Sequence, residues 1–198
     1  MIRERKRRTA VPRKRCMIEV EVKLKICDRN RITQKLTTLD FRMGNQKKET
    51  DIYFDNAEGN FRKEDKALRI RQCENLTTKE SICYMTYKGP KLDHISMTRK
   101  EVELQIEDAQ IGKEMLENLG FMSVHPVIKL RQYFHKENVT ACLDQVEGLG
   151  DFMELEVIVA DEAEKEEALG RIIELLHILG YCKEDIIRTS YLSMLERK

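Results

Sequence analysis

Hydrophobic and charged residues alternate along the stretch MIEVEVKLKI, residues 17–26. The even positions from Ile18 to Ile26 are all aliphatic, and the odd positions from Glu19 to Lys25 are two glutamates followed by two lysines. Because successive side chains of a β-strand point to opposite faces, this stretch predicts a strand with one apolar face and one ionised face.

The same alternation recurs in later segments, among them KALRIRQ, ICYMTYKG, TRKEVELQIE, VIKLRQYFH and FMELEVIV. With turn-like sequences such as NAEGN and GLG, the pattern predicts strands over 17–26, 47–55, 66–73, 81–89, 97–107, 126–135, 138–147 and 151–159. It predicts helices over 29–41, 109–119, 161–180 and 184–197. Strands that follow one another directly favour antiparallel pairing, so we expect an α+β fold.

The charged faces have two interpretations. On an open antiparallel sheet they point to water, which is the ordinary arrangement for any single strand. If the sheet closes into a barrel, the apolar faces pack outward against the helices and the charged faces line a polar lumen. The repeated placement of Arg or Lys beside Glu favours the lumen, because a solvated face usually mixes in Ser, Thr and Asn.

The composition fits one domain whose charges are paired or segregated. Of the 198 residues 41% are hydrophobic and 36% are charged, yet the formal net charge is +1. Residues 1–16 hold eight Arg or Lys and a single acid, so we expect a disordered basic extension before a single domain over 17–198. A basic extension also suits nucleic acid or a membrane surface, but we do not expect it to decide the function.

Targeting and metal-binding signals are sparse. The sequence shows no apolar run long enough to cross a bilayer and no signal peptide, so we expect a cytoplasmic protein without a membrane partner. The six cysteines show no CxxC pair, which predicts free thiols and no structural zinc. His135 falls on a predicted lumen face, where we expect a role in the core or at the rim.

A lumen with many Arg and Lys side chains requires anionic ligands, because unpaired buried charges are costly. Its acids form two Glu-x-Glu pairs, Glu19 with Glu21 and Glu154 with Glu156. Carboxylates are hard oxygen ligands that Mg²⁺ and Mn²⁺ prefer, whereas guanidinium and ammonium groups bind phosphate oxygens. The two kinds of side chain together predict a polyphosphate site.

Several motifs resemble one family. EVEVK at 19–23 matches the ExExK signature of the CYTH superfamily, also called triphosphate tunnel metalloenzymes. The series DIYFD, ALRIR, TYKGP, RKEVE, VIKLRQYF, LDQVEGLGDFMELE and SYLSML is more specific, and it looks most like the class IV adenylyl cyclase branch. The resemblance implies a closed eight-stranded antiparallel β-barrel, the triphosphate tunnel, with a charged lumen and helices packed outside.

The resemblance also implies roles for individual residues. The acids that it assigns to Mg²⁺ or Mn²⁺ are Glu19, Glu21, Asp144, Glu154 and Glu156. The bases that it assigns to the phosphates are Lys23, Arg69, Arg71, Lys88, Lys129 and Arg131. Further residues expected on the tunnel wall are Lys25, Arg99, Glu101 and Glu103. No side chain is expected to act as the nucleophile, since a substrate hydroxyl or water would attack.

The activity implied by the resemblance is conversion of ATP into cyclic AMP and pyrophosphate. Hydrolysis of inorganic triphosphate or of an organic one such as thiamine triphosphate is the alternative, because both reactions need nearly the same side chains. The chain has no Trp to stack on a thiamine ring, and Tyr84, Tyr133 and Phe134 are the candidate ring contacts. A non-catalytic nucleotide-binding or polyphosphate-binding protein is less favoured because both Glu-x-Glu pairs are present. A nucleic acid partner is not expected, and a homodimer stays open.

Overall fold

The structure, a computed structural model, describes residues 17–197. Its strands are β1 (Met17–Lys25), β2 (Arg42–Asn56), β3 (Ala67–Asn75), β4 (Ser81–Lys88), β5 (Arg99–Ile106), β6 (Phe121–Ser123), β7 (Val127–Lys136), β8 (Val139–Val146) and β9 (Gly150–Val159). Its α-helices are α1 (Arg29–Thr38), α2 (Asn60–Lys63), α3 (Ala109–Asn118), α4 (Lys165–Leu179) and α5 (Tyr191–Leu195). Two 3₁₀ helices, Glu162–Glu164 and Lys183–Asp185, lie on either side of α4.

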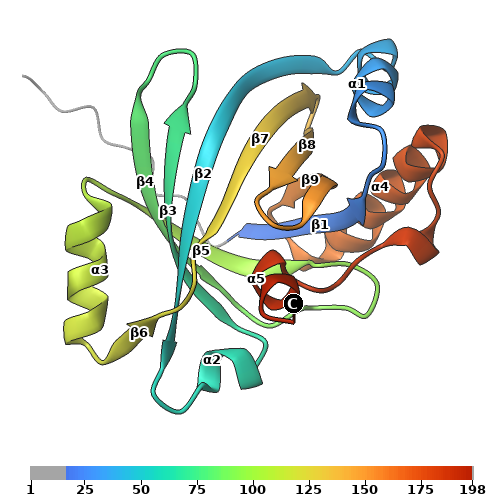
Figure 1. Cartoon of the computed structure of the whole chain (residues 1–198). Coiled ribbons are helices and arrows are strands. Elements are labelled where there is room, and N and C mark those ends of the chain that lie inside the picture. The colour runs from blue at the N-terminus through green and yellow to red at the C-terminus, as the bar shows by residue number, and fades with distance from the viewer. Residues whose placement is uncertain (1–16, 198) are drawn as a thin grey trace, which may run out of the picture.

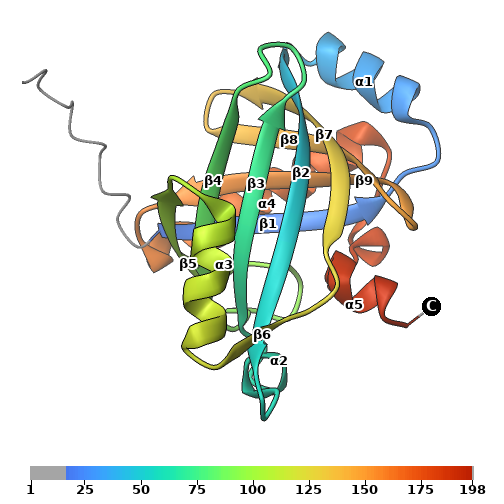
Figure 2. The same ribbon diagram turned by 60° about the vertical axis from the view of Figure 1, so that its left-hand side comes forward.

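Eight of these strands form a closed antiparallel barrel, which confirms the fold that the resemblance implies (Figure 1, Figure 2). The strands pair in the order β3, β4, β5, β1, β9, β8, β7 and β2, and β2 pairs back with β3 to close the ring. The short strand β6 pairs with the last residues of β2. Closure turns the ionised faces of the separate strands into one shared interior.

The apolar faces of the strands point outward, and helices cover them. Val22 and Leu24 of β1 are fully buried in one cluster with Leu36 of α1 and Leu176 of α4. A second cluster joins α3 to β2 and β3. Burial of each such aliphatic side chain contributes about 1.5–3 kcal/mol to stability. The hydrophobic core therefore lies between the barrel and its helices, which leaves the interior to charged residues.

A glycine allows α3 to lie close to the barrel wall. A Cβ at Gly112 would lie 2.8 Å from Cδ1 of Ile106 and 3.1 Å from Cδ1 of Ile70. Any larger residue would require the side chain of Ile106, and to a smaller extent that of Ile70, to move aside. Asp108 caps the helix and accepts hydrogen bonds from the backbone N–H groups of Gln110 and Ile111.

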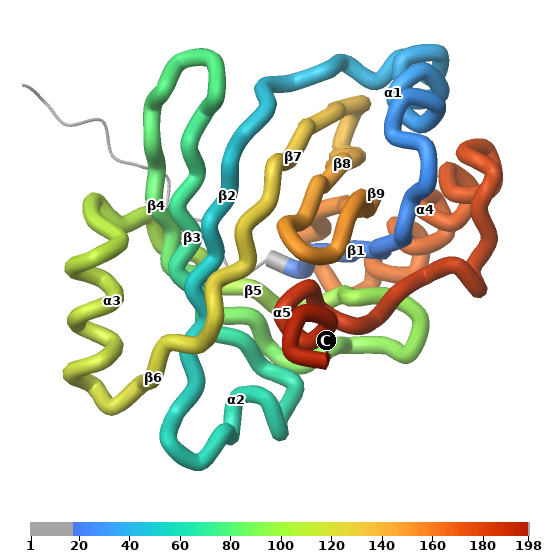
Figure 3. The backbone as a smooth tube through the Cα atoms, in the orientation of Figure 1, coloured from blue at the N-terminus to red at the C-terminus, as the bar shows by residue number. Residues whose placement is uncertain are grey.

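The segment after α4 differs from the helix predicted over 184–197. Its backbone is extended between the second 3₁₀ helix and Ser190, which caps the five-residue helix α5. Ile186 forms a bridge with Leu24, and the N–H of Ile187 donates to the carbonyl of Lys23 at 2.7 Å. Pairing with β1 requires extended backbone here, so the prediction is wrong for this stretch. Figure 3 shows the segment crossing to α5 at one end of the barrel.

The other predicted elements differ mainly at their ends. The helix expected over 161–180 is α4 preceded by a 3₁₀ turn, and the strand expected over 47–55 is the longer β2. A register shift between Met43 and Gln46 lets β2 continue beside β7 after the alternation has broken down. The sequence pattern missed α2 and β6, because elements of four and three residues are too short to show a period.

Free thiols are confirmed for the five cysteines at 27, 73, 83, 142 and 182. Cys16 and the predicted basic extension over 1–16 lie outside the described residues. Within residues 17–197, no helix has the length and apolar character needed to cross a membrane.

Candidate functional site

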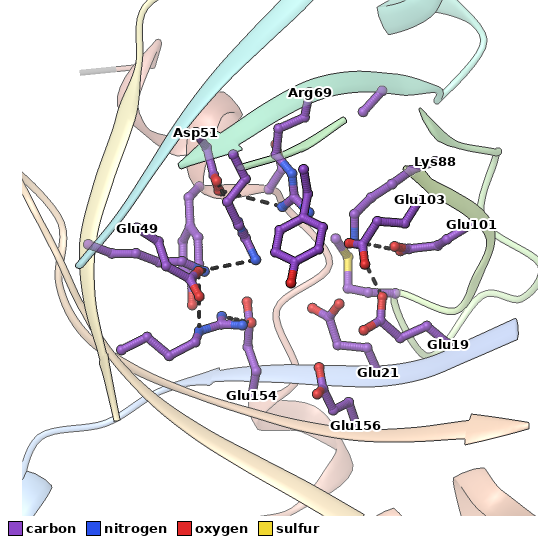
Figure 4. A pocket seen from close by; sticks show the side chains of 18 of the residues that line it. Glu19, Glu21, Glu49, Asp51, Arg69, Lys88, Glu101, Glu103, Glu154 and Glu156 are labelled. Carbon is purple, nitrogen blue, oxygen red and sulfur yellow. Dashed lines mark hydrogen bonds and ion pairs between the residues drawn. The ribbon is translucent and has the colours of Figure 1, made fainter. Parts of the chain in front are cut away.

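The interior of the barrel forms a cavity of about 300 Å³ that is lined mainly by charged side chains (Figure 4). Eight acids line it: Glu19, Glu21, Glu49, Asp51, Glu101, Glu103, Glu154 and Glu156. Eight bases line it: Lys23, Lys47, Arg69, Arg71, Lys88, Arg99, Lys129 and Arg131. The lining is thus formally neutral although it is densely charged.

Thirteen of the fifteen predicted site residues line this cavity. The prediction for Lys25 is wrong, because this last residue of β1 is exposed and its Nζ lies 5.9 Å from the ring of Phe152. Asp144 is fully buried behind the wall. Tyr84 and Tyr133 line the cavity, but Phe134 is in the outer core. His135 is exposed and stacks on Tyr133, so its predicted role in the core is wrong, whereas the predicted role at the rim agrees with its position.

Glu49 is a buried acid that holds three bases of the cavity wall. Its Oε2 lies 3.1 Å from Arg71, 3.3 Å from Lys129 and 3.9 Å from Arg131. The hydroxyl of Tyr133 donates to its Oε1 at 2.6 Å. Burial alone would raise the pKa of Glu49, but the three cations, Arg71 most strongly, hold that pKa well below its usual range. Glu49 is therefore ionised and fixes cations from β3 and β7 around one point.

Asp51 holds the bases of β3 in a similar way. Arg71 donates to both of its oxygens, from Nε at 2.6 Å and from Nη2 at 2.7 Å, and Arg69 lies 3.5 Å away. Burial opposes ionisation, but the two guanidinium groups lower the pKa of Asp51 to about 2. The paired geometry fixes the plane of the Arg71 guanidinium.

Asp144 holds the same wall from behind. Arg131 donates to its two oxygens at 2.6 and 2.5 Å, and Lys129 donates at 3.2 Å. The hydroxyl of Tyr191 on α5 also donates to Asp144, at 3.0 Å. The predicted metal role of Asp144 needs correction, because its oxygens are already bonded and it does not line the cavity. It instead orients bases that do, and Arg131 also donates to Glu154.

Lys23 approaches the cavity over the face of an aromatic ring. Its side chain is 2% exposed, and its Nζ lies 4.5 Å from the centre of the Tyr191 ring, which Lys129 also faces at 5.4 Å. Burial lowers the pKa of Lys23, while Glu154 and Glu21 act in the opposite direction. The ring stabilises two cations that would otherwise repel one another.

Acids predominate on the other side of the cavity, around Lys88 (Figure 4). Lys88 lies 2.5 Å from Glu101 and 3.4 Å from Glu19, and these carboxylates raise its pKa against the effect of burial. Burial raises the pKa of Glu101 to about 8, with Lys88 opposing and Glu19 adding to the rise. Burial acts in the same sense on Glu19, but Lys88 and hydrogen bonds with Glu101 and Glu156 lower its pKa.

Glu21 and Glu156 lie beside these acids, where nearby bases offset too little of the negative charge. Burial and the nearby Glu154 raise the pKa of Glu21, and burial and Glu19 raise the pKa of Glu156 well above its ordinary value. Crowded carboxylates whose ionisation the surroundings disfavour are the oxygen donors that suit a divalent cation. Within residues 17–197 no three acidic, His or Cys side chains form a ready-made ligand cage. A bound ion would offset the repulsion between these carboxylates.

Comparison with known proteins assigns the chain to a family. The sequence signature of the CYTH domain matches residues 17–191. The chain belongs to the CYTH domain family. Its barrel and the matched region coincide from β1 to the first residue of α5.

Three CYTH relatives illustrate the similarity. A Methanocaldococcus jannaschii protein, provisionally named an adenylate cyclase, is 43% identical over 90% of this chain and 98% of its own. Adenylate cyclase CyaB of Aeromonas hydrophila is 29% identical over 90% of this chain and 89% of its own. The solved structure of PH1819 protein from Pyrococcus horikoshii is 37% identical, with a TM-score of 0.82, and covers 91% of this chain and 99% of that one.

The sequence pattern missed several residues that line the CYTH cavity. Glu49 and Asp51 lie on β2, where Lys47, Glu49, Asp51 and Tyr53 alternate with outward residues in the same way as on β1. The signal was present in KKETDIYFD, but neighbouring polar residues on the outer face obscured it. Tyr191 gave no such signal, because its contact with the cavity depends on the path of the chain after α4.

Proposed function

We propose that this CYTH domain is a metal-dependent enzyme that acts on a triphosphate, and that it converts ATP into cyclic AMP and pyrophosphate. The observation that carries the proposal is the excess of acids on one side of the neutral lining and of bases on the other. Such a lining suits an occupant that is itself close to neutral but has divided charge. A triphosphate with divalent cations has this property, with its phosphates toward the bases and its metal toward the acids.

The bases of the cavity would bind the phosphates. Lys129 and Arg131 are held in place by Glu49 and Asp144, so little side-chain freedom would be lost when they contact phosphate oxygens. Arg71 of β3 is held in the same way by Asp51, which accepts from its Nε and Nη2. Binding of the substrate would thus use cations whose positions are set before it arrives.

The acids Glu19, Glu21 and Glu156, with Glu154 beside the bases, would hold Mg²⁺ or Mn²⁺. When bound, such an ion lowers the pKa of an attacking hydroxyl and stabilises charge on leaving phosphate oxygens. In the cyclase reaction the ribose 3′ oxygen forms a bond to the α-phosphorus, and the bond from that phosphorus to the bridging oxygen breaks. The electron pair leaves with pyrophosphate, whose charge Lys23 and Arg131 would stabilise.

Relatives support this choice of reaction. The Methanocaldococcus jannaschii and Aeromonas hydrophila proteins both carry adenylate cyclase in their names, and the first spans nearly the same length at 43% identity. Names of relatives bear on the reaction class, whereas the substrate of this chain needs its own measurement.

Hydrolysis of a triphosphate is the second candidate, and one observation favours it. Apart from the aromatic residues and Cys73, the apolar side chains that line the cavity are Ala67, Met97 and Ile158. An inorganic triphosphate would engage the charged lining without any surface for a nucleobase. In that reaction water attacks the terminal phosphorus and orthophosphate is released.

Product analysis distinguishes the two reactions. The purified protein is incubated with Mg²⁺ or Mn²⁺ and, separately, with ATP, inorganic triphosphate and thiamine triphosphate, and the products are separated by chromatography. Cyclic AMP and pyrophosphate from ATP are expected. Orthophosphate from a triphosphate, with no cyclic nucleotide from ATP, would instead identify a hydrolase. No product from any of the three would contradict both reactions.

A further inference from the structure

A second cavity, of about 260 Å³, adjoins the tunnel at the end where α2 and α5 lie. It is bounded by α2, the loop after it and the segment from Arg188 to Arg197. Arg62 of α2 and Glu196, the residue that follows α5, form an ion pair at 2.5 Å across its rim. The two cavities share lining residues, namely Tyr53, Ala67, Arg99 and Ser190. The second cavity, called the basic cleft below, is therefore continuous with the tunnel wall.

The basic cleft differs from the tunnel in its charge. Six bases line it, Arg62, Lys66, Lys91, Arg99, Arg188 and Arg197, against two acids. Both acids are already engaged. Asp65 binds Lys91 at 2.6 Å and Arg99 at 3.0 Å, and Asp55 accepts hydrogen bonds from the backbone N–H groups of residues 61 and 62. The tunnel lining balances its own charge, whereas the cleft retains an excess of positive charge.

Arg188 is held in the cleft by backbone carbonyls. Its Nη2 donates to the carbonyl of Asp93 at 2.8 Å and its Nε donates to the carbonyl of Ser96 at 3.3 Å. Carbonyls orient a guanidinium without neutralising it, so Arg188 keeps its full charge in a partly buried position. The hydroxyl residues Thr189, Ser190 and Ser193 line the same cleft. Fixed guanidinium groups beside hydroxyls are the usual donors to phosphate oxygens.

We propose that the basic cleft is a second phosphate-binding site, which takes a diphosphate group without a metal ion. The proposal rests on the proposed function in one respect, because triphosphate chemistry supplies such a group. The diphosphate is either free pyrophosphate or the end of a linear polyphosphate that extends from the tunnel through the residues that both cavities share. Binding in the cleft requires no divalent cation, since the excess of positive charge there already complements the anion.

The test is isothermal titration calorimetry, in which pyrophosphate is added to the full chain in the presence of EDTA. We expect Arg188→Gln to weaken this binding by at least about tenfold, because it removes a charged donor. The double variant Lys66→Gln with Arg197→Gln should have a comparable effect. It also keeps the test decisive if Arg188→Gln fails to fold, since Lys66 pairs with Glu64 and Arg197 is exposed, whereas Arg188 holds the loop over 93–96. The control is Arg171→Gln, at an exposed ion pair on α4, which should leave the affinity unchanged.

Unchanged pyrophosphate affinity in both cleft variants would overturn the proposal. If linear tetraphosphate binds more tightly than tripolyphosphate, and the cleft variants lose this difference, the ligand of the cleft is the end of a longer polyphosphate. If the two anions bind equally well, and the cleft variants weaken the binding of pyrophosphate, the ligand of the cleft is free pyrophosphate. Failure of the proposed function shows separately, as absence of metal-dependent turnover, because the titration uses neither metal nor catalysis.

Discussion

Tyr191 and Asp144 join the last helix to the wall of the tunnel. The hydroxyl of Tyr191 donates to Oδ2 of Asp144 at 3.0 Å, and its ring packs edge-on against Phe152 with centroids 5.0 Å apart. Asp144 in turn binds Lys129 and Arg131. The short helix α5 is therefore part of the structure that positions the bases, although it lies far from them in the sequence.

Tyr191→Phe is expected to lower the free energy of unfolding by about 1.5–3 kcal/mol, because it removes one buried hydrogen bond to a charged group and keeps the ring. Tyr191→Ala should cost more, since Lys23 and Lys129 also lose the aromatic face. Urea denaturation measures both. If Tyr191→Phe were as stable as the unaltered chain, the hydrogen bond from α5 to Asp144 would not stabilise the wall.

Replacement of the crowded acids tests the metal assignment. Glu21→Gln and Glu156→Gln should each reduce metal-dependent turnover by about 100-fold or more. The free energy of unfolding without metal should rise or stay constant, because each change removes a carboxylate whose pKa the fold raises. Assays with Mn²⁺ and thermal melts with EDTA measure the two effects. Glu162→Gln, at an exposed acid paired with Lys100, is the matched control. Full turnover in both tunnel variants would show that these acids do not bind the metal.

Glu49→Gln tests whether one acid organises the basic wall. The change leaves Arg71, Lys129 and Arg131 with less compensating charge in a buried position, and it should destabilise the fold by about 3 kcal/mol. Inorganic triphosphate should recover part of this loss, because it supplies negative charge beside the same cations. Denaturation with and without inorganic triphosphate measures both numbers. A loss no larger than that of Glu74→Gln, a partly exposed acid paired with Lys79, would contradict the role of Glu49.

The raised pKa of Glu101 predicts how stability depends on pH. An acid whose pKa is higher in the folded state stabilises the fold below its unfolded pKa, and this contribution is lost as the pH rises through the folded pKa. For Glu101 the window runs from about 4.5 to about 8. The metal-free protein should therefore become less stable across this range, while its apparent affinity for Mn²⁺ increases as protons are released. Asp51, whose pKa is lowered to about 2, acts below this window.

Denaturation curves and metal titrations at several pH values between 5 and 9 measure these trends. Glu101→Gln should reduce both slopes, and the part that remains comes from Glu21 and Glu156, whose pKa values are also raised. Stability that is constant over this range in the unaltered chain would show that Glu101 does not carry the predicted proton.

The sequence predicted the strands well, because burial on one face imposes a period of two that local composition records. The charged rows on β1, β3, β5, β7 and β9 identified most of the cavity lining for the same reason. Lys25 has the same parity as Glu19 and Lys23 but lies where β1 ends. Alternation gives the face of a side chain but not how far the cavity extends along the strand.

Other parts of the site depend on three-dimensional contacts that a linear pattern does not contain. Asp144 looks like a metal ligand in sequence, but its neighbours across β7 and on α5 occupy its oxygens. The segment after α4 has the composition of a helix, yet pairing of Ile186 and Ile187 with β1 holds it extended. In each case a tertiary partner decides the outcome, and that partner is far away in the sequence.

The pairing of β1 with β9 also affects how the chain folds. Val22 lies opposite Leu155, so this seam of the barrel joins segments that are distant in sequence. Such contacts form slowly, because a long loop must be closed before they contribute energy. Until the seam forms, the sixteen charged side chains of the interior remain in contact with water. Closure must then remove water from all of them together, so desolvation and loop closure fall in the same slow step.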